Sequence, residues 1–422
     1  MGIATDFITR RRFVWLAALA GGTLALGGCA DDAASEGAQG AGDSSGTAFD
    51  EPDQSSGGEG AGGEDAQAAA RAAVDERVKA MTLEQKVAQL FVVTPEALVE
   101  GVSQVTQAGD ATHEGVKAYP VGGIVYFAQN LLDPNQVAAM IANVKQFYAD
   151  DGNVAPFIAV DEEGGTVVRI ADNEAFGAQD VGNASDIGNA GDTEAAKRAA
   201  EQIADYLTPL GFNTDFAPVA DVADPTRSDT MGLRSFSSDA QVAADMVRAE
   251  VEGFRDKKML CCAKHFPGIG SAAGDSHEGA ITIEKTTEEL DGVDLVPFKA
   301  AIEAGVPMIM VGHLNLPNII GDNTPATLSS IVVQDMLRDT LGYTGLIVTD
   351  SLSMGAIADY YTPAEAAVAA LKAGCDIPLM PERFTEAYHG VLDAVRTGEV
   401  AETRLDESLI RILTAKQEYF GL

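Results

Sequence analysis

The chain has few of the residues that bind nucleic acids or form disulfide frameworks. Of its 422 residues only 28 are Lys or Arg, against 64 Asp or Glu, and the formal net charge is −36. Such acidity disfavours a nucleic-acid partner, because phosphates are bound through Lys and Arg. Apart from Cys29, the cysteines have neither disulfide-framework nor zinc-site spacing, so we interpret Cys261, Cys262 and Cys375 as small buried apolar residues.

Motifs for metals and phosphates are also missing. The chain has five His residues, and no two have helical metal-ligand spacing or form an H-x-H pair. A metal site built from His265, His277, His313 and a carboxylate is conceivable but disfavoured, so we predict no metal. Gly268 and Gly270 are not followed by the Lys-Ser/Thr pair of a phosphate-binding loop.

The N-terminal residues 1–28 are predicted to be an export signal. Thr9–Val14 resembles a twin-arginine signal, and the apolar run Val14–Leu26 leads into Leu-Gly-Gly-Cys, which resembles a lipobox ending at Cys29. An ordinary secretory signal is the alternative; a membrane span is disfavoured because the run is too short to cross a bilayer. We therefore expect export and lipid anchoring of Cys29 to the outer face of the cytoplasmic membrane.

Residues 29–66 are predicted to be a flexible acidic linker that follows the anchor. Within residues 31–66 there are nine Gly, ten Asp or Glu and no Lys or Arg. This composition cannot bury enough apolar surface to fold. The globular domain is predicted over residues 67–422.

Apolar runs alternate with helical patterns through this domain. Thr362-Pro363-Ala364-Glu365 has the pattern of a capping box with Pro at the first helical position, and Gly374 closes the helix. Strands that alternate with helices indicate a parallel sheet, and eight such units predict an α/β fold with a single (β/α)8 barrel of the TIM type. The eight predicted strands are Leu90–Val93, Gly123–Phe127, Pro156–Val160, Phe212–Pro218, Met259–Ala263, Pro307–Val311, Gly345–Thr349 and Cys375–Leu379.

Polar side chains follow five of these runs, where a barrel places its active site. Asp350 is a candidate nucleophile, although an Asp in this position could equally be a helix N-cap. His277 is a candidate general acid/base with Asp275 beside it, or else an exposed His near a solvated Asp. The polar residues at the strand ends are Asp161, Asp221, Lys264, His265, His313 and Asp350.

A further group of side chains suits a hydroxyl-rich ligand such as a sugar, because it combines many hydrogen-bond donors with a good acceptor. Surface ion pairing is the alternative for the two arginines, and a satisfied core imidazole is the alternative for the His. The group consists of Asp161, Arg169, Arg234, Lys264 and His265.

Ordered motifs over about residues 75–422 resemble the β-N-acetylglucosaminidases of glycoside hydrolase family 3. One such motif would be weak, but their occurrence together and in order is specific. They are GGIVYFAQN at 122–130, VDEEGGTVVR at 160–169, LRSFSSD at 233–239, KHFPG at 264–268, DSH at 275–277, VTDSLSM at 348–354 and RLDESLIRIL at 404–413.

The resemblance implies a retaining exo-hydrolase that releases terminal β-linked N-acetylglucosamine, with peptidoglycan fragments as the expected substrate. It implies that Asp350 is the nucleophile, that His277 is the acid/base, and that Asp275 is its partner. It also implies that Asp161, Arg169, Arg234, Lys264 and His265 hold the sugar's hydroxyl and acetamido groups. We expect a monomer that needs no cofactor.

Three residues depart from the pattern of this family. Ile269 replaces a second His after KHFPG, and Glu162 and Thr166 replace Gln and Arg in the DQEGGR pattern. These changes leave the exact substrate open. The alternatives are a related phosphorylase, a β-glucosidase, which the DSH motif disfavours, and a sugar-binding lipoprotein that has lost catalysis.

Overall fold

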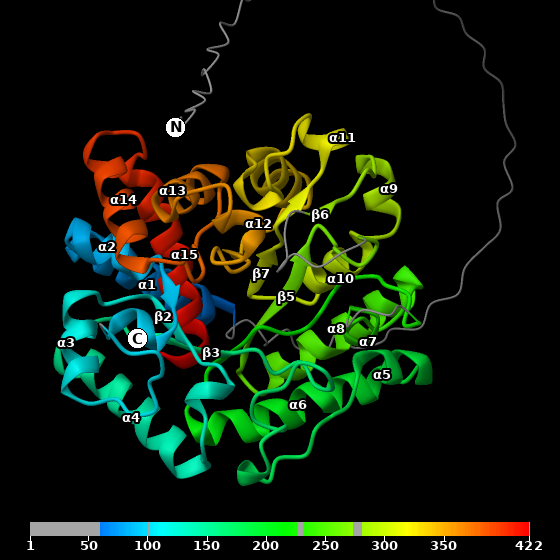
Figure 1. Ribbon diagram of the computed structural model, residues 1–422, viewed down its shortest axis with the longest axis horizontal. Helices are drawn as coiled ribbons and strands as arrows, with labels where there is room; N and C mark the ends of the chain where they lie inside the picture. Colours follow the sequence, from blue (N-terminus) through cyan, green and yellow to red (C-terminus); the bar gives the residue numbers. More distant parts are fainter. Residues whose placement is uncertain (1–59, 100, 227–230, 273–280, 422) are drawn as a thin grey trace, which may run out of the picture. The chain divides into compact units, whose positions relative to one another are not determined.

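A computed structural model describes residues 60–99, 101–226, 231–272 and 281–421 (Figure 1). Its centre is a curled sheet in which every pair of neighbouring strands is parallel, and the spatial order of the strands follows their order in the sequence. The sheet contains β1 (Val92–Val93), β2 (Gly123–Val125), β3 (Phe157–Val160), β4 (Thr214–Asp215), β5 (Leu260–Phe266), β7 (Met308–Val311) and β9 (Leu346–Thr349). The prediction of an α/β fold with a parallel sheet is confirmed.

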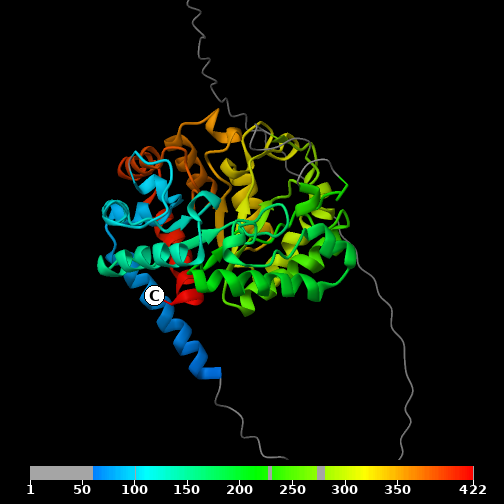
Figure 2. The ribbon, with the colours of Figure 1, turned by 60° about the horizontal axis from the view of Figure 1, so that its bottom comes forward.

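Helices surround this sheet, as Figures 1 and 2 show. Two further short strands, β6 (Ile281–Thr282) and β8 (Leu314–Asn315), pair with each other outside the main sheet. The α-helices are α1 (Gly60–Ala80), α2 (Leu83–Gln89), α3 (Asp110–Ala118), α4 (Pro134–Asp150), α5 (Ala184–Ala190), α6 (Thr193–Leu210), α7 (Met231–Arg234), α8 (Ala240–Asp256), α9 (Thr287–Gly292), α10 (Val296–Glu303), α11 (Pro317–Ile320), α12 (Gly355–Ala358), α13 (Pro363–Ala373), α14 (Phe384–Arg396) and α15 (Glu402–Phe420). A π-helix spans Ile331–Thr340.

The main sheet is buried on both faces. Every residue of β2, β3, β5, β7 and β9 is buried, which is why these strands appear in the sequence as continuous apolar runs rather than alternating patterns. Cys261, Cys262 and Cys375 are free and buried, as predicted. Burial raises the pKa of the Cys375 thiol to about 12, so this side chain behaves as an apolar residue.

The eighth predicted strand, Cys375–Leu379, is not a regular strand. It makes one parallel bridge to each edge of the sheet, between Ile377 and Val348 of β9 and between Leu379 and Val92 of β1. The prediction of eight regular strands is therefore wrong for this segment. The other corrections are to length, because β1 and β4 have two residues each where longer strands were predicted.

Asp376 explains why this segment is irregular yet fixed in place. Its side chain is fully buried, and its Oδ2 atom accepts hydrogen bonds from the backbone N–H of Ile347, at 3.0 Å, and from Arg338. Its Oδ1 atom accepts from the Ser408 hydroxyl at 2.7 Å and from Arg411 at 3.0 Å. One carboxylate thus joins the segment to β9, α15 and the π-helix, in place of a longer backbone ladder.

Two predicted boundaries have different outcomes. Thr362 caps α13 through the predicted capping box with Glu365, and Gly374 closes the helix with φ of 117°, so this prediction is confirmed. By contrast, α1 begins at Gly60, inside the predicted linker, which is therefore helical over its last residues.

The predicted signal peptide and Cys29 lie outside the described residues. Within the part of the chain that the structure describes, no helix has the length and apolar character needed to cross a membrane.

We predict that Asp376→Ala lowers the free energy of unfolding by about 3–5 kcal/mol, because it leaves the buried Arg338 and the half-buried Arg411 without their carboxylate. Urea denaturation measures this difference. Asp393→Ala is the matched control, because Asp393 lies on α14, its side chain is 75% exposed, and it approaches Arg396 only to 3.8 Å. The control is expected to change stability by less than about 0.5 kcal/mol. Equal effects of the two substitutions would contradict the role assigned to Asp376.

Candidate active site at the strand ends

The predicted site residues come from the C-terminal ends of β3, β5 and β9 and from short segments nearby. Asp161 directly follows β3, Lys264 and His265 lie at the end of β5, and Asp350 directly follows β9. Parallel strands place these ends along one edge of the sheet, which is where α/β barrels bind their ligands. The predicted residues Asp275 and His277 lie outside the described residues.

Lys264 brings two carboxylates together. Its Nζ atom lies 2.7 Å from Oδ1 of Asp161 and 2.6 Å from Oε1 of Glu163, and its side chain is 3% exposed. Burial alone would lower the pKa of Lys264, but the charges of Asp161 and Glu163 outweigh burial and raise the pKa above its ordinary value. Lys264 is therefore a fixed cation between the ends of β3 and β5.

Glu163 extends this ion pair to Arg234 on α7. The guanidinium binds the carboxylate in a bidentate manner, with Nε to Oε2 at 2.7 Å and Nη2 to Oε1 at 2.8 Å. Burial would raise the pKa of Glu163, but Arg234 and Lys264 together hold it well below the ordinary range. The surface ion pair considered for Arg234 is wrong, because its partner Glu163 is buried and the Arg234 side chain is only 13% exposed.

Glu162 shapes the loop that carries Arg169. Its carboxylate accepts the backbone N–H groups of Arg169, Ile170 and Ala171 at 2.6–2.9 Å and the Tyr206 hydroxyl at 3.0 Å. The side chain is fully buried. Glu162, which departs from the family pattern, therefore stabilises the backbone of this loop. The Arg169 guanidinium itself lies 5.9 Å from the Phe127 ring centroid. Among the described residues, the Arg169 side chain forms no hydrogen bond with Lys264 or Arg234.

Asp350 lies beside two imidazoles. Burial would raise its pKa, but His265, His313 and the backbone N–H of Ser351, 2.7 Å from Oδ1, together lower the pKa below its ordinary value. The carboxylate is therefore ionised at neutral pH. The helix N-cap alternative is wrong, because the N-cap of the helix that follows, α12, is Met354.

The two histidines at the strand ends have different partners. Nδ1 of His265 lies 2.8 Å from Oδ2 of the buried Asp221. His313 lies 2.6 Å from the Thr327 hydroxyl through Nδ1 and 2.9 Å from the carbonyl oxygen of Ser351 through Nε2. Over the described ranges, no cluster of three or more His, Cys, Asp or Glu side chains is arranged to hold a metal ion.

Sequence reasoning did not single out Glu163 as a site residue. A signal was available, because Asp161 and Glu163 are two residues apart in an extended segment, and such positions share a face. The departure at Ile269 also has a structural reason, since its side chain packs against the small apolar cluster that contains Val219 and Met231.

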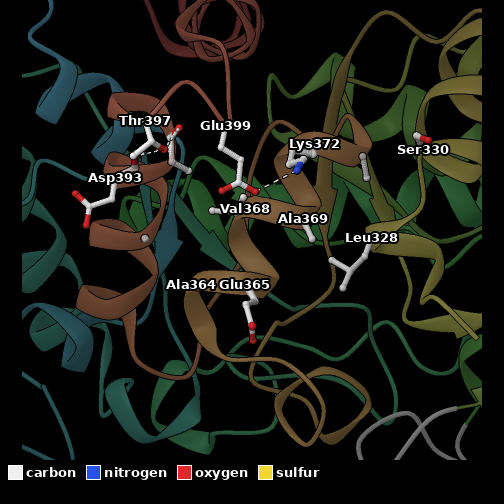
Figure 3. Close-up of a pocket in the computed structure, with 13 residues that line it drawn as sticks. Leu328, Ser330, Ala364, Glu365, Val368, Ala369, Lys372, Asp393, Thr397 and Glu399 are labelled. Atoms are coloured by element: carbon white, nitrogen blue, oxygen red, sulfur yellow. Dashed lines mark hydrogen bonds and ion pairs between the residues drawn. The ribbon is translucent and has the colours of Figure 1, made fainter. Parts of the chain in front are cut away.

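A separate cavity lies on the outer helices (Figure 3). Its volume is about 650 Å³, and its walls come mainly from α13 and α14, with Lys372 and Glu399 paired at 3.1 Å. None of the predicted catalytic or sugar-binding residues lines it. We therefore assign the candidate site to the strand ends and not to this cavity.

Comparison with known proteins identifies the family. Residues 82–415 match the model of the glycosyl hydrolase family 3 N terminal domain. The chain belongs to glycosyl hydrolase family 3. Family 3 membership thus rests on a match that spans most of the described chain, from α2 to α15.

Several relatives in this family have related names. The chain is 33% identical to beta-hexosaminidase A of Pseudoalteromonas piscicida over 327 residues, which are 72% of this chain and 54% of that protein. It is 32% identical to beta-hexosaminidase LpqI of Mycobacterium tuberculosis over 344 residues, which are 78% of this chain and 82% of that protein. The chain therefore spans about half the length of the first relative and most of the second.

A solved structure resembles the fold closely. It is a glycoside hydrolase family 3 beta-N-acetylglucosaminidase from Paenibacillus sp. str. FPU-7, which superimposes with a TM-score of 0.75 at 38% sequence identity. The match covers 81% of this chain and 63% of that chain. The curled parallel sheet is therefore the fold of this family.

Two buried carboxyl groups, those of Glu250 and Glu163, make the free energy of unfolding depend on pH in opposite directions. Glu250 on α8 is buried, and burial followed by the nearby charge of Glu163 raises its pKa from 4.5 to about 8. Between these values the folded protein keeps a proton that the unfolded chain has lost, so stability falls by about 1.4 kcal/mol per pH unit as pH rises. Glu163 has a lowered pKa, so its contribution is present above pH 4.5 and is lost as pH falls below it.

We predict that Glu250→Gln gains stability relative to wild type as pH rises from about 5 to 8, since Gln does not lose a proton. Glu163→Gln is expected to be less stable by at least about 2 kcal/mol at pH 7, and the deficit is expected to shrink below about pH 4.5. Urea denaturation across pH measures both differences. The two variants control each other, and parallel pH profiles would contradict the assignment of both carboxyls.

Proposed function

We propose that the protein is a retaining exo-acting β-N-acetylglucosaminidase that removes terminal β-linked N-acetylglucosamine from peptidoglycan fragments. The observation that carries the proposal is Asp350 directly after β9, ionised because its neighbours, among them His265, His313 and Lys264, outweigh burial and lower its pKa. Family membership and the names of the relatives support the sugar class. The seven-stranded sheet, together with Cys375–Leu379 in the eighth place, forms the (β/α)8 barrel of this proposal.

The proposed reaction has two displacements. One carboxylate oxygen of Asp350 attacks the anomeric carbon, the bond from that carbon to the leaving oxygen breaks, and His277 gives its proton to the leaving oxygen. His277 then takes a proton from water, and the hydroxide attacks the anomeric carbon and releases Asp350. The pair of inversions retains the β configuration. Asp275 orients the His277 imidazole through the two steps, and no cofactor takes part.

The buried ion pairs have a binding role in this proposal. Asp161 and Lys264 offer an acceptor and donors at the end of the sheet, and Glu163 fixes Lys264 and Arg234 before the ligand arrives. Arg169 and His265 complete the set that holds hydroxyl and acetamido groups. Pre-ordered polar groups lose little conformational entropy on binding, which favours a rigid sugar.

We predict that Asp350→Asn lowers kcat for 4-nitrophenyl β-N-acetylglucosaminide by about 10⁴-fold or more, because the amide cannot form the glycosyl ester. Release of 4-nitrophenol measures the rate, and the β-glucoside tests the sugar preference. Asp359→Asn is the matched control, because this exposed Asp lies nine residues further along and outside the site. Its rate is expected to equal that of wild type.

The same assay separates the alternatives. Turnover that requires added phosphate would replace the hydrolase with a phosphorylase, because phosphate would then take the place of water. If the wild-type protein binds the sugar but does not turn it over, the result would refute the enzyme and support a sugar-binding lipoprotein. Equal rates for Asp350→Asn and wild type would contradict the nucleophile.

We further propose that the protein is a monomer that is exported and anchored by a lipid on Cys29. The Leu-Gly-Gly-Cys sequence at the end of an apolar run supports this proposal. Cys29→Ala is expected to move the protein from the membrane fraction to the soluble fraction, as immunoblotting of fractionated cells would show. Cys261→Ala is the control and is expected to stay with the membrane; membrane retention of Cys29→Ala would refute the anchor.

A further inference from the structure

The buried carboxylate of Asp221 has a role that the proposed reaction does not yet use. Asp221 follows β4 and is fully buried. Its Oδ2 atom lies 2.8 Å from Nδ1 of His265 and accepts the backbone N–H of His265 at 3.2 Å, and its Oδ1 atom accepts the backbone N–H of Ile269 at 2.7 Å. Three nitrogen atoms from the end of β5 and the turn after it thus converge on one side chain.

This arrangement determines where the shared proton lies. Each oxygen of Asp221 already accepts a backbone N–H group, so the carboxylate acts as an acceptor on both sides. An unprotonated Nδ1 would direct its lone pair at Oδ2 across 2.8 Å, which is repulsive. The proton between the two side chains therefore belongs to Nδ1 of His265.

We propose that Asp221 is a positioning residue that fixes the ring orientation and the Nδ1–H form of His265, so that Nε2 is the nitrogen that acts on the ligand beside Asp350. The kinetic part of this inference rests on the proposed function, whereas the protonation part does not. Burial would raise the pKa of Asp350, and His265 is among the groups that hold it below its ordinary value. Asp221 thus acts on the nucleophile through His265 without touching the sugar.

Nitrogen NMR of the ¹⁵N-histidine-labelled protein tests the protonation directly. The chain has five His residues, so the signals of His265 are assigned by their loss in His265→Gln. We expect wild-type Nδ1 to be protonated at neutral pH, and we expect Asp221→Asn to shift the ring toward the Nε2–H form. Glu250→Gln, which removes another buried carboxyl, is expected to leave the His265 signals in place. An unprotonated Nδ1 in the wild-type protein would overturn the proposal even if no variant folded.

Kinetics distinguish positioning of His265 from support of the backbone at Ile269. Asp221→Asn is expected to lower kcat/KM for the N-acetylglucosaminide by about 10- to 100-fold. In the His265→Gln background, Asp221→Asn is expected to lower kcat/KM by less than about 3-fold, because the imidazole that Asp221 positions is no longer there. Equal losses in both backgrounds would show that Asp221 acts through the backbone, which overturns the proposal. A wild-type protein without turnover would instead contradict the proposed function, while the NMR result would stand.

Discussion

The site depends on one chain of buried charges, which runs from Asp161 through Lys264 and Glu163 to Arg234. These residues come from the ends of β3 and β5 and from α7, which are far apart in the sequence. A buried ion without its partners costs several kcal/mol, so each member holds the others in place. Folding of the three elements and assembly of the candidate site are therefore the same event.

Asp350 interacts with this chain of charges through electrostatics and not through a direct ion pair with Lys264. Its burial opposes ionisation, yet the nearby imidazoles of His265 and His313 and the cation of Lys264 lower its pKa. The protein as a whole is strongly acidic, with a formal charge of −36, so the ionised state of this buried carboxylate depends on the few groups that surround it. The overall charge favours solubility, whereas the site depends on a few positioned partners.

Most of the sheet could be predicted from the sequence, because strands buried on both faces leave continuous apolar runs. β3 and β9 lie within one residue of their predicted bounds. The predicted run ended at Ala263 because Lys264 and His265 are polar, whereas β5 continues to Phe266. The segment around Asp376 could not be predicted, since its pairing is replaced by side-chain bonds to distant arginines. Glu163 was missed because its partner Arg234 lies 71 residues away, so only the two-residue spacing from Asp161 pointed to it. The roles of Asp275 and His277 stay predictions.

A crystal structure of the protein with N-acetylglucosamine would show where the sugar binds. We expect the sugar to lie over the strand ends, with its hydroxyl groups bonded to Asp161, Lys264 and His265 and its anomeric carbon about 3–3.5 Å from a carboxylate oxygen of Asp350. A sugar bound instead in the cavity between α13 and α14, with the strand ends free of ligand, would refute the assignment of the site.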